Sequence, residues 1–529
     1  MRPPTPPTAV FALCMIFATM APLWVYANDP VQDIADLIDR RISERLQAEK
    51  ASPAVRSSDA EFLRRVSLHL SGTIPTVGDV RQFLQDSDRG KRRRVVNDLL
   101  SGPAFLNHFT QVWRHALIPE AEADLQLRGL QPPFEAWLRE QLAHQTPYDE
   151  MVRQLLTAEL PSTNQVANGG NGIEQQPSPV GFFQAKQVSA ENLAAATSRA
   201  FLGVRLECAQ CHDHPFDTWK RDDFWSFAAF YAGFVKPQGD ANPLGPVREF
   251  RERRELTIPS TSRVRPALFL DGTSPTWKPR ATSRELLADW ITAPENPWFA
   301  KMAVNRLWAH FFGIGFVSPL DDFSATNPPS HPELLDELAE VLVGSEFDLT
   351  QLMRGILASE TYQRSSQQAK SEQSDIRLFA RMPVQGLTPE QIDRSFRVAL
   401  GQPVSLRNPN PFAISSDPQE QQILNLFAAG SEPTVERQST ILQALFLMNG
   451  ATTNQSPATL QALNAFPGLS AEEQVEVLFL ATLSRRPQPE EQAEFARYVE
   501  SGGSTQSSQQ ALQDVLWALL NSAEFLFNH

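Results

Sequence analysis

Residues 31–48 read VQDIADLIDRRISERLQA, and the spacing of their apolar side chains decides the fold class. Apolar residues recur there every three or four positions, which places them along one face of an α-helix. These residues are Ile34, Leu37, Ile38, Ile42 and Leu46. A second stripe of the same kind contains Val475, Leu478, Phe479 and Leu483. The sequence therefore predicts a mainly α-helical protein.

Signals for helix starts are frequent along the chain. In a capping box, a hydroxyl accepts a hydrogen bond from a backbone amide, and an acidic or amide side chain three residues later reaches back. Four pairs have this spacing: Thr282 with Glu285, Ser330 with Glu333, Thr388 with Gln391, and Ser470 with Glu473. Together with 41 prolines in the chain, these signals predict many short helices separated by ordered loops.

Residues 1–27 have the pattern of a signal peptide. Arg2 precedes an apolar core at residues 9–18, and Val25-Tyr26-Ala27 offers a cleavage site before Asn28. The alternative is an anchor that stays in the membrane, but Pro22 and the short apolar run argue against it, because a spanning helix needs about 20 apolar residues. We expect an exported protein of the periplasm, cell envelope or extracellular space, with no transmembrane segment after signal removal.

The charge balance disfavours one class of partner. The chain has 47 Lys and Arg residues against 61 Asp and Glu residues, so a nucleic-acid partner is not expected. A basic run, Lys91 to Arg94, is interpreted as a solvated helix face.

The chain is predicted to form two multi-helical domains, at residues 28–240 and 281–529. Residues 241–280 lie between them as an extended or β linker. Two extended candidates, Glu249–Ile258 and Val264–Leu270, give this region a small β element.

One motif carries recognisable chemistry, the pentapeptide Cys208-Ala209-Gln210-Cys211-His212. Covalent attachment of haem c requires two thiols three residues apart, one for each vinyl group, followed by a histidine that ligates the iron. The motif meets these requirements, so Cys208 and Cys211 are predicted to hold the haem and His212 to be the proximal iron ligand.

Two other interpretations of the motif stay open. The cysteines could form a structural or redox disulfide, although so short a loop gains little entropy from closure. Alternatively, Cys208, Cys211, His212 and His214 could bind zinc or another non-haem metal, although adjacent Cys211 and His212 fit poorly on one ion. If haem is bound, the second axial ligand is undecided. The candidates in the first domain are His69, His108, His115, His144 and Met151.

Several segments resemble a known pair of domains. Residues 62–76 (FLRRVSLHLSGTIPT) and 208–219 (CAQCHDHPFDTW) resemble the planctomycete secretion cytochrome-like domain. The second half is similar to its companion planctomycete secretion domain, at residues 293–297 (APENP), 304–313 (VNRLWAHFFG), 327–336 (NPPSHPELLD) and 516–527 (LWALLNSAEFLF). The resemblance covers nearly all of the mature chain, but both families are of unknown function.

Three functions are consistent with these observations. The first is an exported electron-transfer or redox protein with one haem c and an unidentified redox partner in the cell envelope. The second is a non-enzymatic envelope or surface scaffold, with a disulfide or non-haem metal at the motif. The third is an enzyme acting on an extracellular polymer through polar residues of the second domain, although a satisfied structural network is the favoured interpretation of these residues. These residues are Asn305, Arg306, His310, Asp321, Asp322 and His331.

Overall fold

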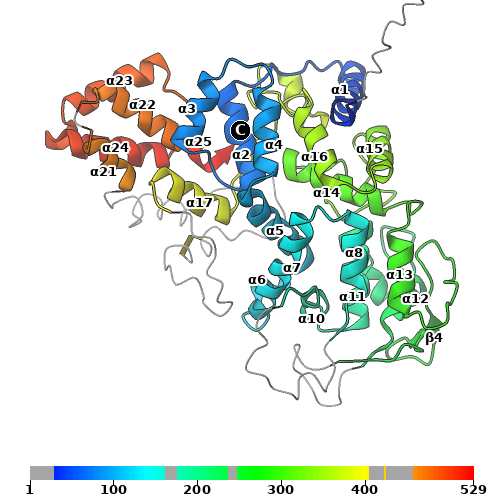
Figure 1. Cartoon of the computed structure of the whole chain (residues 1–529). Helices are drawn as coiled ribbons and strands as arrows, with labels where there is room; N and C mark the ends of the chain where they lie inside the picture. The colour runs from blue at the N-terminus through cyan, green and yellow to red at the C-terminus, as the bar shows by residue number, and fades with distance from the viewer. Residues whose placement is uncertain (1–28, 161–175, 236–246, 404–421, 424–456, 467) are drawn as a thin grey trace, which may run out of the picture.

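The computed structural model describes residues 29–160, 176–235, 247–403, 422–423, 457–466 and 468–529. The proposed signal peptide, residues 1–27, lies outside this part of the chain. Helices account for most of the described residues, and strands occur there only as two-stranded pairs (Figure 1). The mainly α-helical prediction, with a small β element, is confirmed.

The helices of the first half are short and closely spaced. They are α1 (Pro30–Ala48), α2 (Asp59–Ser71), α3 (Val77–Gln85), α4 (Lys91–Leu100), α5 (Pro103–Leu117), α6 (Glu120–Ala123), α7 (Gln131–Ala143), α8 (Tyr148–Leu156), α10 (Gly181–Ala185), α11 (Ala190–Thr197) and α12 (Arg221–Ala228). The predicted stripe on residues 34–46 is the buried face of α1.

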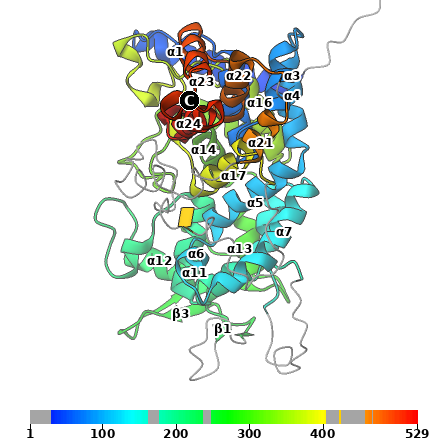
Figure 2. The ribbon, with the colours of Figure 1, turned by 90° about the vertical axis from the view of Figure 1, so that its left-hand side faces the viewer.

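The second half continues in the same manner. Its helices are α13 (Ser283–Ile291), α14 (Phe299–Phe312), α15 (Pro332–Gly344), α16 (Leu349–Ala358), α17 (Pro389–Ala399), α21 (Ala458–Asn464), α22 (Ala471–Thr482), α23 (Pro489–Glu500), α24 (Ser508–Leu520) and α25 (Ala523–Leu526). Figures 1 and 2 place α21 to α24 at one end of the molecule, and α11, α12 and the linker strands at the other.

The linker contributes to two antiparallel strand pairs, one of which it shares with residues 234–235 of the first half. Strand β1 (Phe234–Val235) pairs with β2 (Arg248–Glu249), and β3 (Glu255–Thr257) pairs with β4 (Val264–Pro266). The predicted extended segments thus contain short strands. A third pair, which the sequence did not predict, joins β5 (Gln385–Gly386) to β6 (Phe527–Asn528) near the end of the chain.

Two hydrophobic cores hold these elements together. The larger core includes side chains from α1, α2, α5, α7 and α8 together with α13 to α16, so both halves of the sequence contribute to it. The smaller core joins α17 and α21 to α24, and Leu68 of α2 and Ile74 also belong to it. Helix α2 therefore contributes to both cores.

Three of the four predicted capping boxes are present, at the starts of α13, α17 and α22. The fourth prediction, at Ser330, is wrong. Helix α15 begins at Pro332 with His331 as its N-cap, and the amide of Ser330 donates to the carbonyl of Phe316 instead. Proline at the first helical position has fixed the start one residue later.

The interpretation of the basic run as solvated is also wrong in part. Lys91 and Arg92 are mostly buried and both pair with Asp59 of α2, with N–O distances of 2.6 and 2.9 Å. Arg93 and Arg94 remain about half exposed. The pair at Asp59 joins α4 to α2.

In the described part of the chain, no helix combines the length and apolar character needed to cross a bilayer.

A glycine at the α1–α16 contact generates the first prediction. A Cβ atom added to Gly355 would lie 2.5 Å from the Cβ atom of Ile34, because the two helices touch at this point. Replacing Gly355 with alanine should lower the free energy of unfolding by about 1–3 kcal/mol, as overpacking does in cores. Denaturant unfolding followed by circular dichroism measures the change.

Gly344 provides the matched control. It is exposed at the end of α15, and an added Cβ atom would meet nothing within 4 Å. Gly344→Ala should be neutral or stabilise the protein by about 0.5 kcal/mol. Equal effects of the two substitutions would contradict the close packing of α1 on α16.

Candidate functional site

The Cys208–His212 motif lies on a surface loop between α11 and α12. The motif follows α11 and a single π-helical turn, Ser198–Leu202. A short 3₁₀ turn, Glu207–Gln210, then carries the first cysteine. Cys208, Cys211 and His212 are exposed, whereas Ala209 between the cysteines is fully buried. The buried side chain of Ala209 therefore attaches the loop to the core, while the two thiols and the imidazole face solvent.

Hydrogen bonds hold the backbone of this loop in place. The indole Nε1 of Trp225 on α12 donates to the carbonyl of Gln210 at 3.0 Å. The amide of Arg221 donates to Oδ1 of Asp213 at 2.9 Å, and the amide of His214 donates to the carbonyl of Trp219 at 2.8 Å. The start of α12 thus positions the motif.

The contacts of His212 determine which ring nitrogen is available. Its Nδ1 lies 2.8 Å from the backbone carbonyl of Asp213, and only a protonated Nδ1 can donate to that oxygen. Nε2 of the neutral ring then carries the lone pair, which is the usual arrangement of a histidine that ligates a metal. Because His212 is exposed, it is not packed into an apolar core.

The disulfide and the non-haem metal site, the other two interpretations of the motif, can be compared with the positions of its side chains. Cys208 and Cys211 are free cysteines and form no disulfide in this structure. Across the described residues, no three His, Cys, Asp or Glu side chains are grouped so as to hold a metal ion. In particular, Nδ1 of His214 accepts from the amide of Phe216 at 3.3 Å. The four candidate ligands of a non-haem site thus do not converge on one point.

Residues of the second half of the chain form ion pairs and a backbone hydrogen bond with the segment that precedes the motif. Asp321, with its side chain 8% exposed, binds Arg199 of the π turn and Arg205, which precedes the motif, at 2.7 and 2.8 Å. The amide of Phe323 donates to the carbonyl of Gly203 at 2.9 Å. Gly203 has a φ of +67°, and a Cβ atom there would collide with the Phe323 ring. The segment around Asp321 therefore fixes the chain just before Cys208.

Most polar residues singled out in the second half have structural partners. The amide group of Asn305, which is fully buried, donates to and accepts from the backbone of Val317, both at 3.0 Å. Asp321 forms the ion pairs described above, and Arg306 donates to the carbonyl of Ala200 at 3.2 Å. The partners of these three residues are backbone groups or arginines of other segments, and the bonds hold loops to helices.

A cluster of three histidines lies where α2, α5 and α14 meet. The ring centroids of His69 and His310 are 5.8 Å apart, as are those of His108 and His310. Both ring nitrogens of His69 have hydrogen-bond partners. Nδ1 lies 2.9 Å from the Tyr362 hydroxyl, and Nε2 lies 2.8 Å from the side-chain Nδ2 of Asn528. The sequence did not reveal this cluster, because its members are separated by up to 241 positions and share no motif.

The remaining candidates for a second axial ligand have other surroundings. His115, although it shares α5 with His108, contacts Glu122 and Glu390, which raises its pKa despite its burial. Met151 is buried in the larger core, and His144 is exposed at the end of α7.

The Asp321 ion pairs allow a direct test. Asp321→Asn should lower the free energy of unfolding by about 1–2 kcal/mol, a modest loss because Arg199 and Arg205 are partly exposed. Hydrogen exchange at residues 198–210 should accelerate. Asp322→Asn is the control, because no ion pair of Asp322 is seen among the described residues, and it should stay within about 0.5 kcal/mol. Unchanged exchange in Asp321→Asn would show that Asp321 does not hold the loop.

The histidine cluster predicts a pH dependence of stability. Burial lowers the pKa of His310 from 6.5 to about 4, and burial also lowers the pKa of His69 and His108. As the pH falls below 6.5, these histidines bind protons in the unfolded chain while they stay neutral in the folded chain. The free energy of unfolding is therefore highest above pH 6.5 and decreases as the pH falls toward 4. Nε2 of His310 lies 2.9 Å from the backbone carbonyl of His69. His310→Gln keeps a donor for this carbonyl and should reduce the loss by about 1–2 kcal/mol. Urea unfolding at pH 7 and pH 4.5 measures it, with the exposed His144→Gln as control. An identical loss in both variants would contradict the assignment.

Comparisons with known proteins agree with the two-part organisation. Residues 37–236 match the model of PSCyt2, a protein of unknown function (DUF1549), and residues 283–425 match PSD1, a protein of unknown function (DUF1553). No curated protein and no solved structure is significantly similar to the chain. The two matches occur in this order and agree with the resemblance found in the sequence. The chain therefore matches a PSCyt2 domain followed by a PSD1 domain, both families of unknown function.

Proposed function

We propose that this chain is an exported redox protein that carries one haem c on the Cys208–His212 loop. Thioether bonds from Cys208 and Cys211 would hold the group, and Nε2 of His212 would ligate its iron. The observation that carries the proposal is the geometry of the loop. Its two thiols are exposed and unbonded, and the contact between His212 Nδ1 and the Asp213 carbonyl leaves Nε2 without that contact and able to act as a ligand.

The attachment chemistry needs nothing further from this chain. Each thiol adds across one vinyl group, with sulfur bonding to one vinyl carbon and the thiol hydrogen passing to the other. No electrons are gained or lost in this addition, but both cysteines must be reduced. When bound, haem supplies one-electron transfer at iron.

The protein's own residues would fix the orientation of the group. Buried Ala209 and the bond from Trp225 to Gln210 hold the two cysteine backbones. Phe216, which is 77% exposed on the same loop, offers apolar surface beside the motif. An exposed loop suits electron transfer, because a partner in the cell envelope can approach it directly.

Expression in a host able to attach haem c tests the proposal. The intact mass of the secreted protein should exceed that of residues 28–529 by one haem, and the haem should stay with the chain on a denaturing gel. Cys208→Ser or Cys211→Ser should weaken or abolish this retention, because each removes one covalent bond. His212→Ala should alter the iron absorption spectrum, because it removes a ligand.

His214→Ala is the matched control on the same loop. It should leave the added mass of one haem and the iron absorption spectrum unchanged. Loss of a chelatable metal in His214→Ala would favour the non-haem site instead. Colourless protein with the mass of the polypeptide alone would rule out haem and favour a scaffold role.

A further inference from the structure

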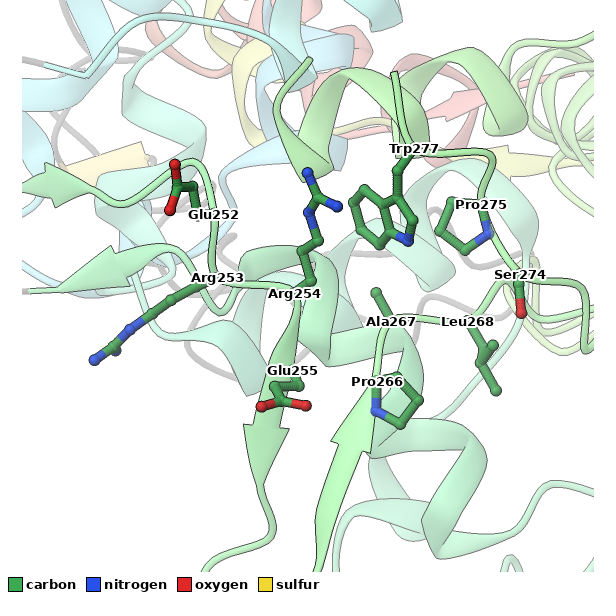
Figure 3. A pocket seen from close by; sticks show the side chains of 10 residues that line it. All are labelled: Glu252, Arg253, Arg254, Glu255, Pro266, Ala267, Leu268, Ser274, Pro275 and Trp277. Atoms are coloured by element: carbon green, nitrogen blue, oxygen red, sulfur yellow. The ribbon is translucent and has the colours of Figure 1, made fainter. Parts of the chain in front are cut away.

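A pocket in the linker lies beside the β3–β4 hairpin and has a volume of about 330 Å³ (Figure 3). This volume is at the small end of the range for ligand pockets. Its walls come from three segments, residues 252–255, 266–268 and 274–277. Backbone hydrogen bonds fix the walls, since Ala267 donates to the carbonyl of Arg254 at 2.8 Å and Leu268 donates to Ser226 at 3.2 Å.

Arg254 is the unusual residue of this pocket. Its guanidinium faces the Trp277 ring (Figure 3), and the distance from the guanidinium carbon to the ring centre is 4.1 Å. Its Nε is buried without a hydrogen-bond partner, and no described carboxylate pairs with the group. Arg253, the other arginine of the lining, is exposed and its guanidinium lies 5.6 Å from the centre of the Phe250 ring. Two arginines of neighbouring segments are ion-paired. Arg284 binds Glu249 at 2.6 Å and Arg263 binds Asp222 at 2.7 Å.

The surroundings of Arg254 define the chemistry of a ligand. A guanidinium is a fork of donors that matches a carboxylate in two parallel hydrogen bonds. Pro275, Ala267 and Trp277 supply an apolar wall for the body of the ligand. Glu252 and Glu255 are exposed on the opposite side, where they can accept hydrogen bonds from hydroxyl or ammonium groups and would repel a second negative charge.

We propose that this pocket binds a small organic monocarboxylate about the size of one sugar or amino-acid residue. Arg254 holds its carboxylate, and Trp277 and Pro275 contact its ring or apolar body. The site is separate from the Cys208–His212 loop and does not depend on haem. A uronic acid and an N-acylated amino acid share the required chemistry.

Isothermal titration of the full chain with matched probes tests the proposal. Glucuronate is compared with glucose, and N-acetylphenylalanine is compared with its amide. At least one carboxylate should bind about tenfold or more tightly than its neutral partner, because hydrogen bonds between charged groups are the stronger class. The pair that responds identifies the source of the carboxylate. Equal affinity within both pairs, or no heat with any carboxylate, would overturn the proposal.

Variants then assign the effect to Arg254. Arg254→Gln should lose about tenfold or more of the carboxylate affinity, and Arg254→Lys should lose less, because it keeps the charge but not the fork. Arg251→Gln is the control, as this exposed residue does not line the pocket and should change affinity less than about twofold. If Arg254→Gln binds as tightly as the unmodified chain, the proposal fails. Circular dichroism confirms folding, and the comparison of probes on the unmodified chain needs no variant.

Discussion

Helix α2 is buried along its whole length after Glu61, and the two guanidinium groups of Arg64 and Arg65 are the constraint on which the surrounding structure depends. Arg64 donates to the carbonyls of Thr482 and Phe525 at 3.0 and 2.8 Å. Arg65 donates to the carbonyls of Tyr362 and Arg364 at 2.7 and 2.9 Å. Burial of such cations is costly unless their donors are satisfied, and it lowers the pKa of Arg64 to about 10. The chain therefore folds its middle and its C-terminal end around one early helix.

This arrangement explains why both halves share a core. Arg65 also donates to the carbonyl of His529, the last residue, at 3.2 Å, and the β5–β6 pair lies beside this contact. Asn528, one residue earlier, binds His69 of the same helix. Figure 1 shows the C-terminus beside α2. Contacts made at the very end of the chain thus complete the environment of its second helix.

The Cys208–His212 loop is positioned by contacts of the same kind, but its reactive groups remain outside. Asp321 and Phe323 of the second half hold the backbone before the motif, while Trp225 of α12 holds the carbonyl of Gln210 between the two cysteines. The buried histidines, by contrast, are held neutral inside the protein by desolvation. The buried histidines thus serve packing, whereas the thiols and the imidazole of the Cys208–His212 loop face solvent. Exposed thiols and an oriented imidazole on a braced loop suit covalent attachment of a large group.

Local patterns in the sequence determined the helices and the motif. Apolar spacing placed the buried face of α1, three hydroxyl–acid or hydroxyl–amide pairs marked helix starts, and the spacing of Cys208, Cys211 and His212 needs no tertiary information. These features depend on residues within one or two turns of each other, so they are readable along the chain. Two predictions failed, the capping box at Ser330 and the solvated position of Lys91. In each case the residue bonds to a partner distant in sequence, the carbonyl of Phe316 for Ser330 and the carboxylate of Asp59 for Lys91. Only the tertiary structure decided the Arg64 and Arg65 contacts, the histidine cluster and the pocket of Arg254. Each of these joins residues from different secondary-structure elements, and the physical reason for their positions is the packing of those elements on one another, which no local pattern encodes.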